Sequence, residues 1–147
     1  MSAIPAGAFR VSEYVRWSDV DAASLLCYGS YVRFFEIAEM ELFRAVGLSY
    51  GKIFDRLDIW LPRASMHWDF RSPVLLDERL EVALWVARFG RTSMTLDFAV
   101  EKEVEGGRRR TADGRVVMVA IARESLRPVP IPDELVEKLR PYHFAAA

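Results

Sequence analysis

The sequence predicts an α+β protein in which a mostly antiparallel sheet wraps around one long central helix. Two patterns lead to this prediction: a segment of helical period follows a first strand, and several segments of alternating polar and apolar residues come after it. In addition, the apolar stripe of the helical segment is too wide for a helix that lies on a surface. No repeat, low-complexity tract or linker divides the 147 residues, so we expect one domain over 1–147.

The first half of the chain supplies the first strand and the helix. Residues Phe9–Trp17 alternate and predict a strand. From Gly29 to about Val46, apolar side chains recur three or four residues apart, which is typical of a helix, and Gly47 is suited to cap its C-terminus. We expect a short second helix just before Leu57.

Four further strands are predicted in the second half. Segments near 65–70, 80–87 and 94–101 alternate as half-buried strands do, and Val116–Ala122 is apolar on both faces, as in a central covered strand. The residues "EGG" at 105–107 predict a turn, and "DG" at 113–114 is interpreted as a bulge inside one long strand. Pro132 opens a terminal helix, and the tail from about 141 to 147 is expected to be frayed.

Composition restricts the binding partners and the cellular compartment that we expect for this protein. A formal charge of −1 and a pI near 6.1 give no reason to expect nucleic acid or an anionic membrane as a partner. No apolar run approaches the ~20 residues that span a bilayer, and the first residues do not resemble a secretory signal. The single cysteine, Cys27, suits a reducing compartment, so we expect a cytoplasmic protein without membrane insertion.

The sequence lacks several common catalytic and cofactor-binding motifs. His67 and His143 are the two histidines, and no Gly-x-Ser-x-Gly elbow accompanies them. No residues have zinc-site spacing, and neither a Walker loop nor a Gly-x-Gly-x-x-Gly turn occurs, so we expect no metal. Catalysis would have to use carboxylates, backbone dipoles and a tyrosine or serine.

The segment "WSDVDAASLLCYGSY" places two aspartates just before the long helix. Asp21 has two possible roles: a cap that accepts hydrogen bonds from nearby amides, or a catalytic carboxylate beside a helix N-terminus. Asp19 is interpreted as a structural or cap residue. Cys27 is not expected to be a nucleophile, because the motif places no histidine near it.

The longer segment "WSDVDAASLLCYGSYVRFFEIAEMELF" resembles the first motif of the 4-hydroxybenzoyl-CoA thioesterase family, which has the hotdog fold. The likeness continues through "LPRASMHWDFRSPVLLDERLEV" and "RFGRTSMTLDF". Ser24 stands where the family usually has glycine, and Tyr28 is closer to the hydroxybenzoyl-CoA subgroup than to the subgroup with histidine there. The positions that match the first motif are Asp21, Leu25, Leu26, Tyr28, Tyr31, Glu36 and Ala38.

The resemblance implies hydrolysis of an acyl-CoA or acyl-carrier-protein thioester in a cleft between two subunits of a homodimer or homotetramer, with no cofactor besides the CoA of the substrate. Asp21 would be the nucleophile or general base, and the backbone N–H of Tyr28 would polarise the thioester carbonyl. Further residues are expected around the substrate. Gly29, Tyr31, Leu61, Pro62 and Arg63 would contact the acyl group, and Arg88, Arg91, Thr92 and Ser93 would bind the CoA phosphates unless they form a plain solvated turn.

Two other functions remain open. A non-catalytic acyl-CoA sensor would share the pocket without needing Asp21. This alternative stays open because Ser24 departs from the glycine that is usual in the family. A hotdog hydratase or dehydratase would need a histidine working with an acid, and the chain has Leu26 five residues beyond Asp21.

Overall fold

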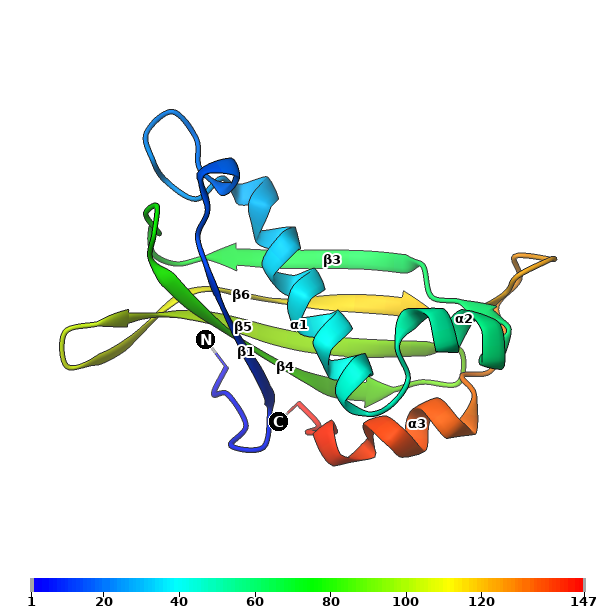
Figure 1. Cartoon of the computed structure of the whole chain (residues 1–147). Helices are drawn as coiled ribbons and strands as arrows, with labels where there is room; N and C mark the ends of the chain where they lie inside the picture. The colour runs from blue at the N-terminus through cyan, green and yellow to red at the C-terminus, as the bar shows by residue number, and fades with distance from the viewer. Residues whose placement is uncertain (1, 147) are drawn as a thin grey trace.

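A computed structural model describes residues 2–146 and contains a five-stranded antiparallel sheet that curves around a long helix (Figure 1). Hydrogen-bonded neighbours follow the order β1-β4-β5-β6-β3, so β1 and β3 form the two edges of the sheet. The sheet strands are β1 (Phe9–Tyr14), β3 (Arg63–Phe70), β4 (Arg79–Phe89), β5 (Ser93–Val104) and β6 (Gly107–Val119). The helices are α1 (Tyr31–Ala45), α2 (Tyr50–Leu57) and α3 (Asp133–Leu139), and a short separate pair consists of β2 (Ile59–Trp60) and β7 (Ile121–Ala122).

The central helix α1 lies against one face of the sheet, and its wide apolar stripe is buried there. Phe34, Ala38, Leu42 and Phe43 are fully buried in the main core, together with the inward side chains of β4, β5 and β6. Gly47 has a φ of +81° and its amide donates to the carbonyl of Arg44, so it caps α1 as predicted. The predicted helix wrapped by an antiparallel sheet is confirmed.

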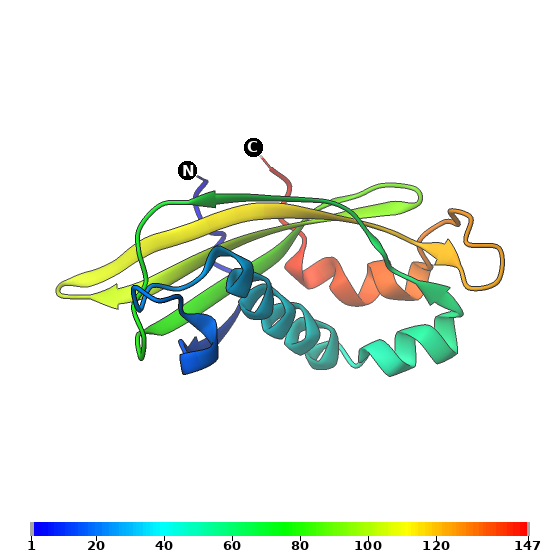
Figure 2. The same ribbon diagram turned by 90° about the horizontal axis from the view of Figure 1, so that it is seen from above.

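Both ends of the chain lie on the face of the sheet opposite α1 (Figure 2). A small second cluster forms there, in which Ile4 and Phe144 pack against the buried Trp85. The Phe144 amide donates to the carbonyl of Val86 at 2.9 Å, and the ring of Tyr142 meets Phe9 edge-to-face. The prediction of a frayed tail is therefore wrong for residues 142–144, because the second cluster and the sheet hold them, while Ala147 lies outside the described residues.

Two strand predictions need correction. The β3 segment was expected to be half-buried, but Met66 is 40% exposed and Phe70 is 54% exposed, because an edge strand lacks a neighbour on one side. The apolar run Val116–Ala122 is not one strand. It divides at Ala120, so that β6 ends and β7 pairs with β2.

Strand β6 runs without a break through the "DG" residues at 113–114, as predicted. The predicted bulge, however, lies a few residues earlier in the strand. Val100 pairs with Ala112 and Glu101 pairs with Arg110, so Thr111 is the extra residue. Gly114 instead allows a close approach, because a Cβ atom there would lie 2.0 Å from the carbonyl oxygen of His67.

Candidate active site

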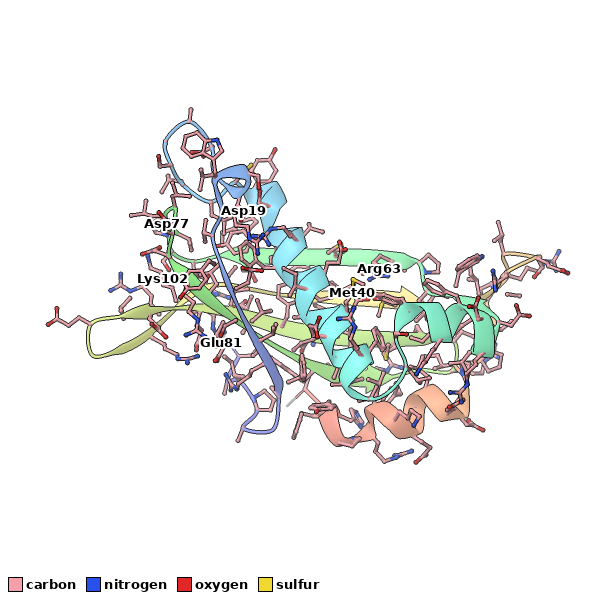
Figure 3. All side chains as sticks on the ribbon, in the orientation of Figure 1. Asp19, Met40, Arg63, Asp77, Glu81 and Lys102 are labelled. Carbon is pink, nitrogen blue, oxygen red and sulfur yellow. The ribbon has the colours of Figure 1, made fainter. Side chains whose placement is uncertain are left out.

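The loop before α1 is held by Asp19. Its side chain is buried, accepts a 2.7 Å hydrogen bond from Nε of Arg33 and a 2.8 Å bond from the amide of Arg16, and its carbonyl accepts from the amide of Cys27. Burial acts to raise the pKa of Asp19, but the hydrogen bonds and positive charges of Arg33 and Arg16 outweigh it and lower that pKa below its ordinary value. Asp19 is therefore a structural anchor, as the sequence indicated (Figure 3).

Asp21 lies on the exposed part of the same loop. Its Oδ1 accepts hydrogen bonds from the amides of Ala23 at 2.8 Å and Leu25 at 3.3 Å. The other oxygen, Oδ2, has no hydrogen-bond partner among residues 2–146. One oxygen thus shapes the loop while the second is free to meet a ligand.

Ser24, which occupies the usual glycine position, has a φ of +60°. This is the left-handed region, where a side chain with a Cβ is strained by ~1–2 kcal/mol and glycine is not. The loop therefore keeps a glycine-like backbone although the glycine is absent.

Replacing Ser24 with glycine is expected to stabilise the protein by up to about 1 kcal/mol, because relief of the left-handed strain exceeds the greater chain entropy of glycine. Urea denaturation of parent and Ser24→Gly proteins measures the difference. A loss of stability in the variant would mean that the serine side chain contributes more than its backbone costs.

The N-terminus of the central helix begins with a short 3₁₀ helix, Tyr28–Ser30, which continues into α1. The first amides of a helix have no acceptor within it, and those of Tyr28 and Gly29 donate no hydrogen bond within residues 2–146. Both residues are exposed, and the space beside Gly29 is open. The positive end of the helix dipole is thus accessible from solvent.

Asp21 and Tyr28 line a pocket of about 420 Å³, and the predicted Gly29 lies next to it in the chain without lining it. Asp21, Tyr28 and Tyr31 were predicted members of the site, and the structure brings them together here. The opposite wall was not predicted: it is formed by the end of β3 and the segment after it, namely Phe70, Arg71, Ser72, Pro73 and Val74. Phe70 was expected on the buried face of a half-buried strand, and it is exposed because β3 is an edge strand.

The predicted acyl and CoA residues at 61–63 and 88–93 do not line this pocket. Within the single chain they lie at the opposite end of the sheet from Asp21. The carbonyl of Pro62 accepts from the amide of Val119, and the carbonyl of Thr92 accepts from the amide of Ala120. The pocket wall at Phe70 instead pairs with Ala112. The stretch of β6 between 112 and 119 is about 23 Å long at ~3.3 Å per residue.

Two groups of predicted residues therefore occupy opposite ends of the sheet. The first surrounds Asp21. The second combines Leu61–Arg63 with Arg88 and the turn Arg91–Ser93 that joins β4 to β5. Leu61 is 4% exposed and belongs to the core, so its side chain does not face solvent, whereas Arg63 is partly exposed.

The side chain of Arg63 forms an ion pair with Glu39 of α1, which with Glu36 is an acid on an otherwise apolar helix. Glu39 is fully buried on a helix that otherwise presents apolar residues to the sheet. Burial raises the pKa of Glu39 to about 7; the charge and hydrogen bond of Arg63 oppose the rise, and Glu36 adds to it. An acid on a broad apolar stripe is the sequence signal that identifies it.

Glu39 is expected to make folding less favourable as pH rises. Because its folded-state pKa is raised from 4.5 to about 7, the stability associated with its protonated form is complete below pH 4.5 and is lost as pH rises through 7. Glu39→Gln should remove this loss, which amounts to about 3 kcal/mol. Urea titrations of both proteins between about pH 5 and pH 8 test it, and a difference in stability that does not change with pH would contradict it.

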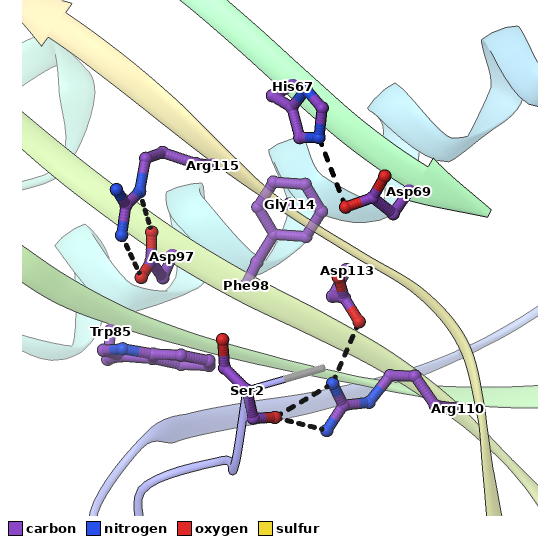
Figure 4. Close-up of a pocket in the computed structure, with 10 residues that line it drawn as sticks. All are labelled: Ser2, His67, Asp69, Trp85, Asp97, Phe98, Arg110, Asp113, Gly114 and Arg115. Carbon is purple, nitrogen blue, oxygen red and sulfur yellow. Dashed lines mark hydrogen bonds and ion pairs between the residues drawn. The ribbon is translucent and has the colours of Figure 1, made fainter. Parts of the chain in front are cut away.

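A second depression, of about 360 Å³, lies on the outer face of the sheet (Figure 4). Its charged side chains pair with one another. Arg115 binds Asp97 through two hydrogen bonds, and Arg110 binds Asp113. His67 contacts Asp69 at 3.2 Å and lines this depression but not the pocket at Asp21, so this face does not supply a histidine to that pocket.

Within residues 2–146, no three His, Cys, Asp or Glu side chains are grouped as a metal site. The same residues contain no helix long and apolar enough to cross a membrane.

A curved antiparallel sheet around one long helix, with an exposed carboxylate at the helix N-terminus, defines a hotdog-fold protein of the thioesterase class. The chain belongs to the thioesterase-like superfamily, whose family model matches residues 15–139. The predicted fold, family and enzyme class, a thioester hydrolase, are thereby confirmed.

Three relatives illustrate the likeness. The chain is 29% identical over 128 residues to a 1,4-dihydroxy-2-naphthoyl-CoA hydrolase of Synechococcus sp. (strain CC9605), covering 84% of this chain and 83% of that one. The structure of the PA5185 protein from Pseudomonas aeruginosa is 30% identical, covers 94% and 93% of the two chains, and has a TM-score of 0.79. A 4-hydroxybenzoyl-CoA thioesterase bound to 4-hydroxybenzoyl-CoA shares the fold, with 19% identity, a TM-score of 0.83 and coverage of 91% and 99%.

Proposed function

We propose that this protein hydrolyses an acyl- or aroyl-CoA thioester to the free acid and CoA, with Asp21 as the catalytic carboxylate. The observation that carries this proposal is the shared pocket in which an exposed aspartate meets the helix N-terminus at Tyr28. Unpaired helix amides can stabilise the oxyanion that forms as the carbonyl carbon becomes tetrahedral.

Two chemical routes use the same geometry. In one, Asp21 attacks the thioester carbonyl, CoA leaves as the thiolate, and water then hydrolyses the mixed anhydride. In the other, Asp21 removes a proton from a water molecule that attacks the carbonyl directly. The free Oδ2 of Asp21 suits either role, and the amides of Tyr28 and Gly29 would bind the developing negative charge in both.

The open edge of β3 supports a homodimer as the working unit. The amide of Arg71 donates to the carbonyl of Thr111. By the alternation of antiparallel pairs, the main-chain N–H and C=O groups of Met66, Trp68 and Phe70 then point away from β6. An edge of this length with exposed apolar side chains favours pairing with another strand, and a second copy supplies a matching one.

Antiparallel pairing of β3 with its copy would join the two separated groups of site residues. Each Phe70 would lie beside the start of β3 in the partner subunit, where Arg63 and the nearby Arg91–Ser93 turn are found. Arg63 and the CoA-binding residues inferred from the sequence would then complete the pocket around Asp21, whereas Leu61 stays in the core. A tetramer of two such dimers is compatible with this arrangement.

The substrate is inferred at the level of class. The names of two of these relatives refer to thioesters of hydroxylated aromatic acids, so we include aryl-CoA thioesters as well as alkyl ones. CoA or an acyl-carrier protein would carry the acyl group, and the proposed reaction needs no cofactor. The single cysteine favours the cytoplasm as its location.

A non-catalytic acyl-CoA sensor is the second candidate, and one observation favours it. Oδ1 of Asp21 already accepts two loop amides, which is the geometry of a structural cap. A hydratase or dehydratase finds no such support, because His67 lies on the outer face and His143 packs against Phe89.

Thiol release from a panel of aryl- and alkyl-CoA thioesters tests the proposal directly. An enzyme-only blank is needed because Cys27 carries a free thiol. Turnover of any member supports a thioesterase, and tight binding of CoA esters without turnover would instead support the sensor.

A further inference from the structure

The ion pair between Glu39 and Arg63 connects the buried side of α1 to the start of the edge strand β3. Oε1 of Glu39 accepts from Nη2 of Arg63, while Oε2 is buried and has no partner among residues 2–146. Replacing such a pair with apolar side chains is often stabilising. Its presence here therefore calls for a role other than stability.

Arg63 is held in one orientation. Nη1 donates to the carbonyl of Leu61 at 2.9 Å, and Nη2 donates to the hydroxyl of Tyr50 at 3.1 Å as well as to Glu39. A guanidinium has five N–H donors. The Nε–H and one Nη1–H are left without an acceptor in residues 2–146, and the side chain is 33% exposed.

The exposed side of Arg63 lines a pocket of about 440 Å³ between α1, α2 and β3. The walls are mostly apolar and are formed by Val32, Phe35, Met40, Phe54 and Met66, with Tyr50 and Glu36 as further members. An apolar pocket with one oriented donor fits an apolar group that carries a hydrogen-bond acceptor at its end.

We propose that Arg63, positioned by Glu39, forms the polar end of the acyl pocket and selects acyl groups that carry an oxygen atom at their distal end. This inference rests on the proposed function and on pairing of β3 with its copy, which brings the pocket of one subunit beside Asp21 of the other. The distal oxygen accepts from the free N–H groups of Arg63. Glu39 lies behind Arg63, out of contact with solvent, and acts as a positioning residue.

The charge state of the pair sets which oxygen group is preferred. Three groups face Glu39 or its partner: Arg63 from β3, Glu36 from α1 and Tyr50 from α2. Since the pKa of Glu39 lies at about 7, the pair is neutral above that pH, while below it Arg63 carries an uncompensated positive charge. A carboxylate-ended acyl group gains from that charge, and a hydroxyl-ended one gains much less.

The experiment compares kcat/KM for hexanoyl-, 6-hydroxyhexanoyl- and adipoyl-CoA, and for benzoyl- and 4-hydroxybenzoyl-CoA. In the parent we expect about a tenfold or greater preference for the oxygen-bearing member of at least one of the two series. Arg63→Met should abolish the preference, because it slows the oxygen-bearing substrates more than the plain ones. Arg44→Met, at an exposed pair with Glu41, is the matched control and should change neither.

Two further variants keep the test decisive. Arg63→Met leaves Glu39 buried without its partner, so the double variant Glu39→Gln/Arg63→Met removes both charges and should show the same loss of preference with a more stable fold. Glu39→Gln alone should abolish the rise in the adipoyl-to-hydroxyhexanoyl ratio that we expect in the parent as pH falls through 7. A structural role for Glu39 would not produce that pH dependence.

An equal loss on plain and oxygen-bearing substrates in Arg63→Met, or no preference in the parent, would overturn the inference. If the parent hydrolyses no thioester, the proposed function fails first. Calorimetric binding of CoA thioethers with the same chain ends then tests the inference separately: discrimination that depends on Arg63 supports it, and equal affinities reject it.

Discussion

Asp21→Asn is expected to lower kcat for thioester hydrolysis by about 10²-fold or more, with a small effect on KM. An amide has the same shape as the carboxylate but neither attacks a thioester nor takes a proton from water. Its carbonyl oxygen still accepts the amides of Ala23 and Leu25, so the loop should keep its conformation. Thiol release on the best substrate of the panel measures the effect.

The matched control is Asp55→Asn, which makes the same chemical change at an exposed position on α2. It should retain full activity. Thermal melts of both variants separate a chemical defect from an unfolded loop. If Asp21→Asn hydrolyses its substrate at the parental rate, Asp21 is a cap for the loop and the catalyst must be sought elsewhere in the pocket.

Met66→Pro is expected to convert the protein to a monomer and to reduce turnover by about 10²-fold or more, because each pocket would lose the half contributed by the partner. The main-chain N–H of Met66 points to the open edge of β3, so a proline there would remove a hydrogen bond of the proposed dimer and none to β6. Sedimentation analysis and circular dichroism measure assembly and folding alongside activity.

Met66→Ala keeps the N–H group and should remain a dimer, which separates the main-chain effect from loss of the side chain. A second test mixes inactive Asp21→Asn with Arg63→Met subunits on an oxygen-bearing substrate. Hybrid dimers contain one complete site if Asp21 and Arg63 act across the interface, so activity should return on mixing. A Met66→Pro monomer with parental turnover would show that one subunit suffices.

Local patterns in the sequence were enough to predict the main elements. The helical period from Tyr31 to Ala45 and the glycine at 47 depend on residues within a few positions of one another, as do the turn at 105–107 and the carboxylate just before the helix. Such features are set by short-range sterics and hydrogen bonding. The resemblance then identified Asp21 and Tyr28, and both line one pocket.

The tertiary structure alone decided which strand became an edge and which residues meet. The exposure of Phe70, the separation of Asp21 from Arg63 and the pairing of Arg63 with Glu39 all follow from the order β1-β4-β5-β6-β3. Strand order and register join segments far apart in the chain, and the sum of many burial and hydrogen-bond energies selects them rather than any local preference. For that reason the sequence alone was sufficient to identify the helix and its carboxylate, whereas the shape of the acyl pocket and its polar end depended on how the sheet assembled.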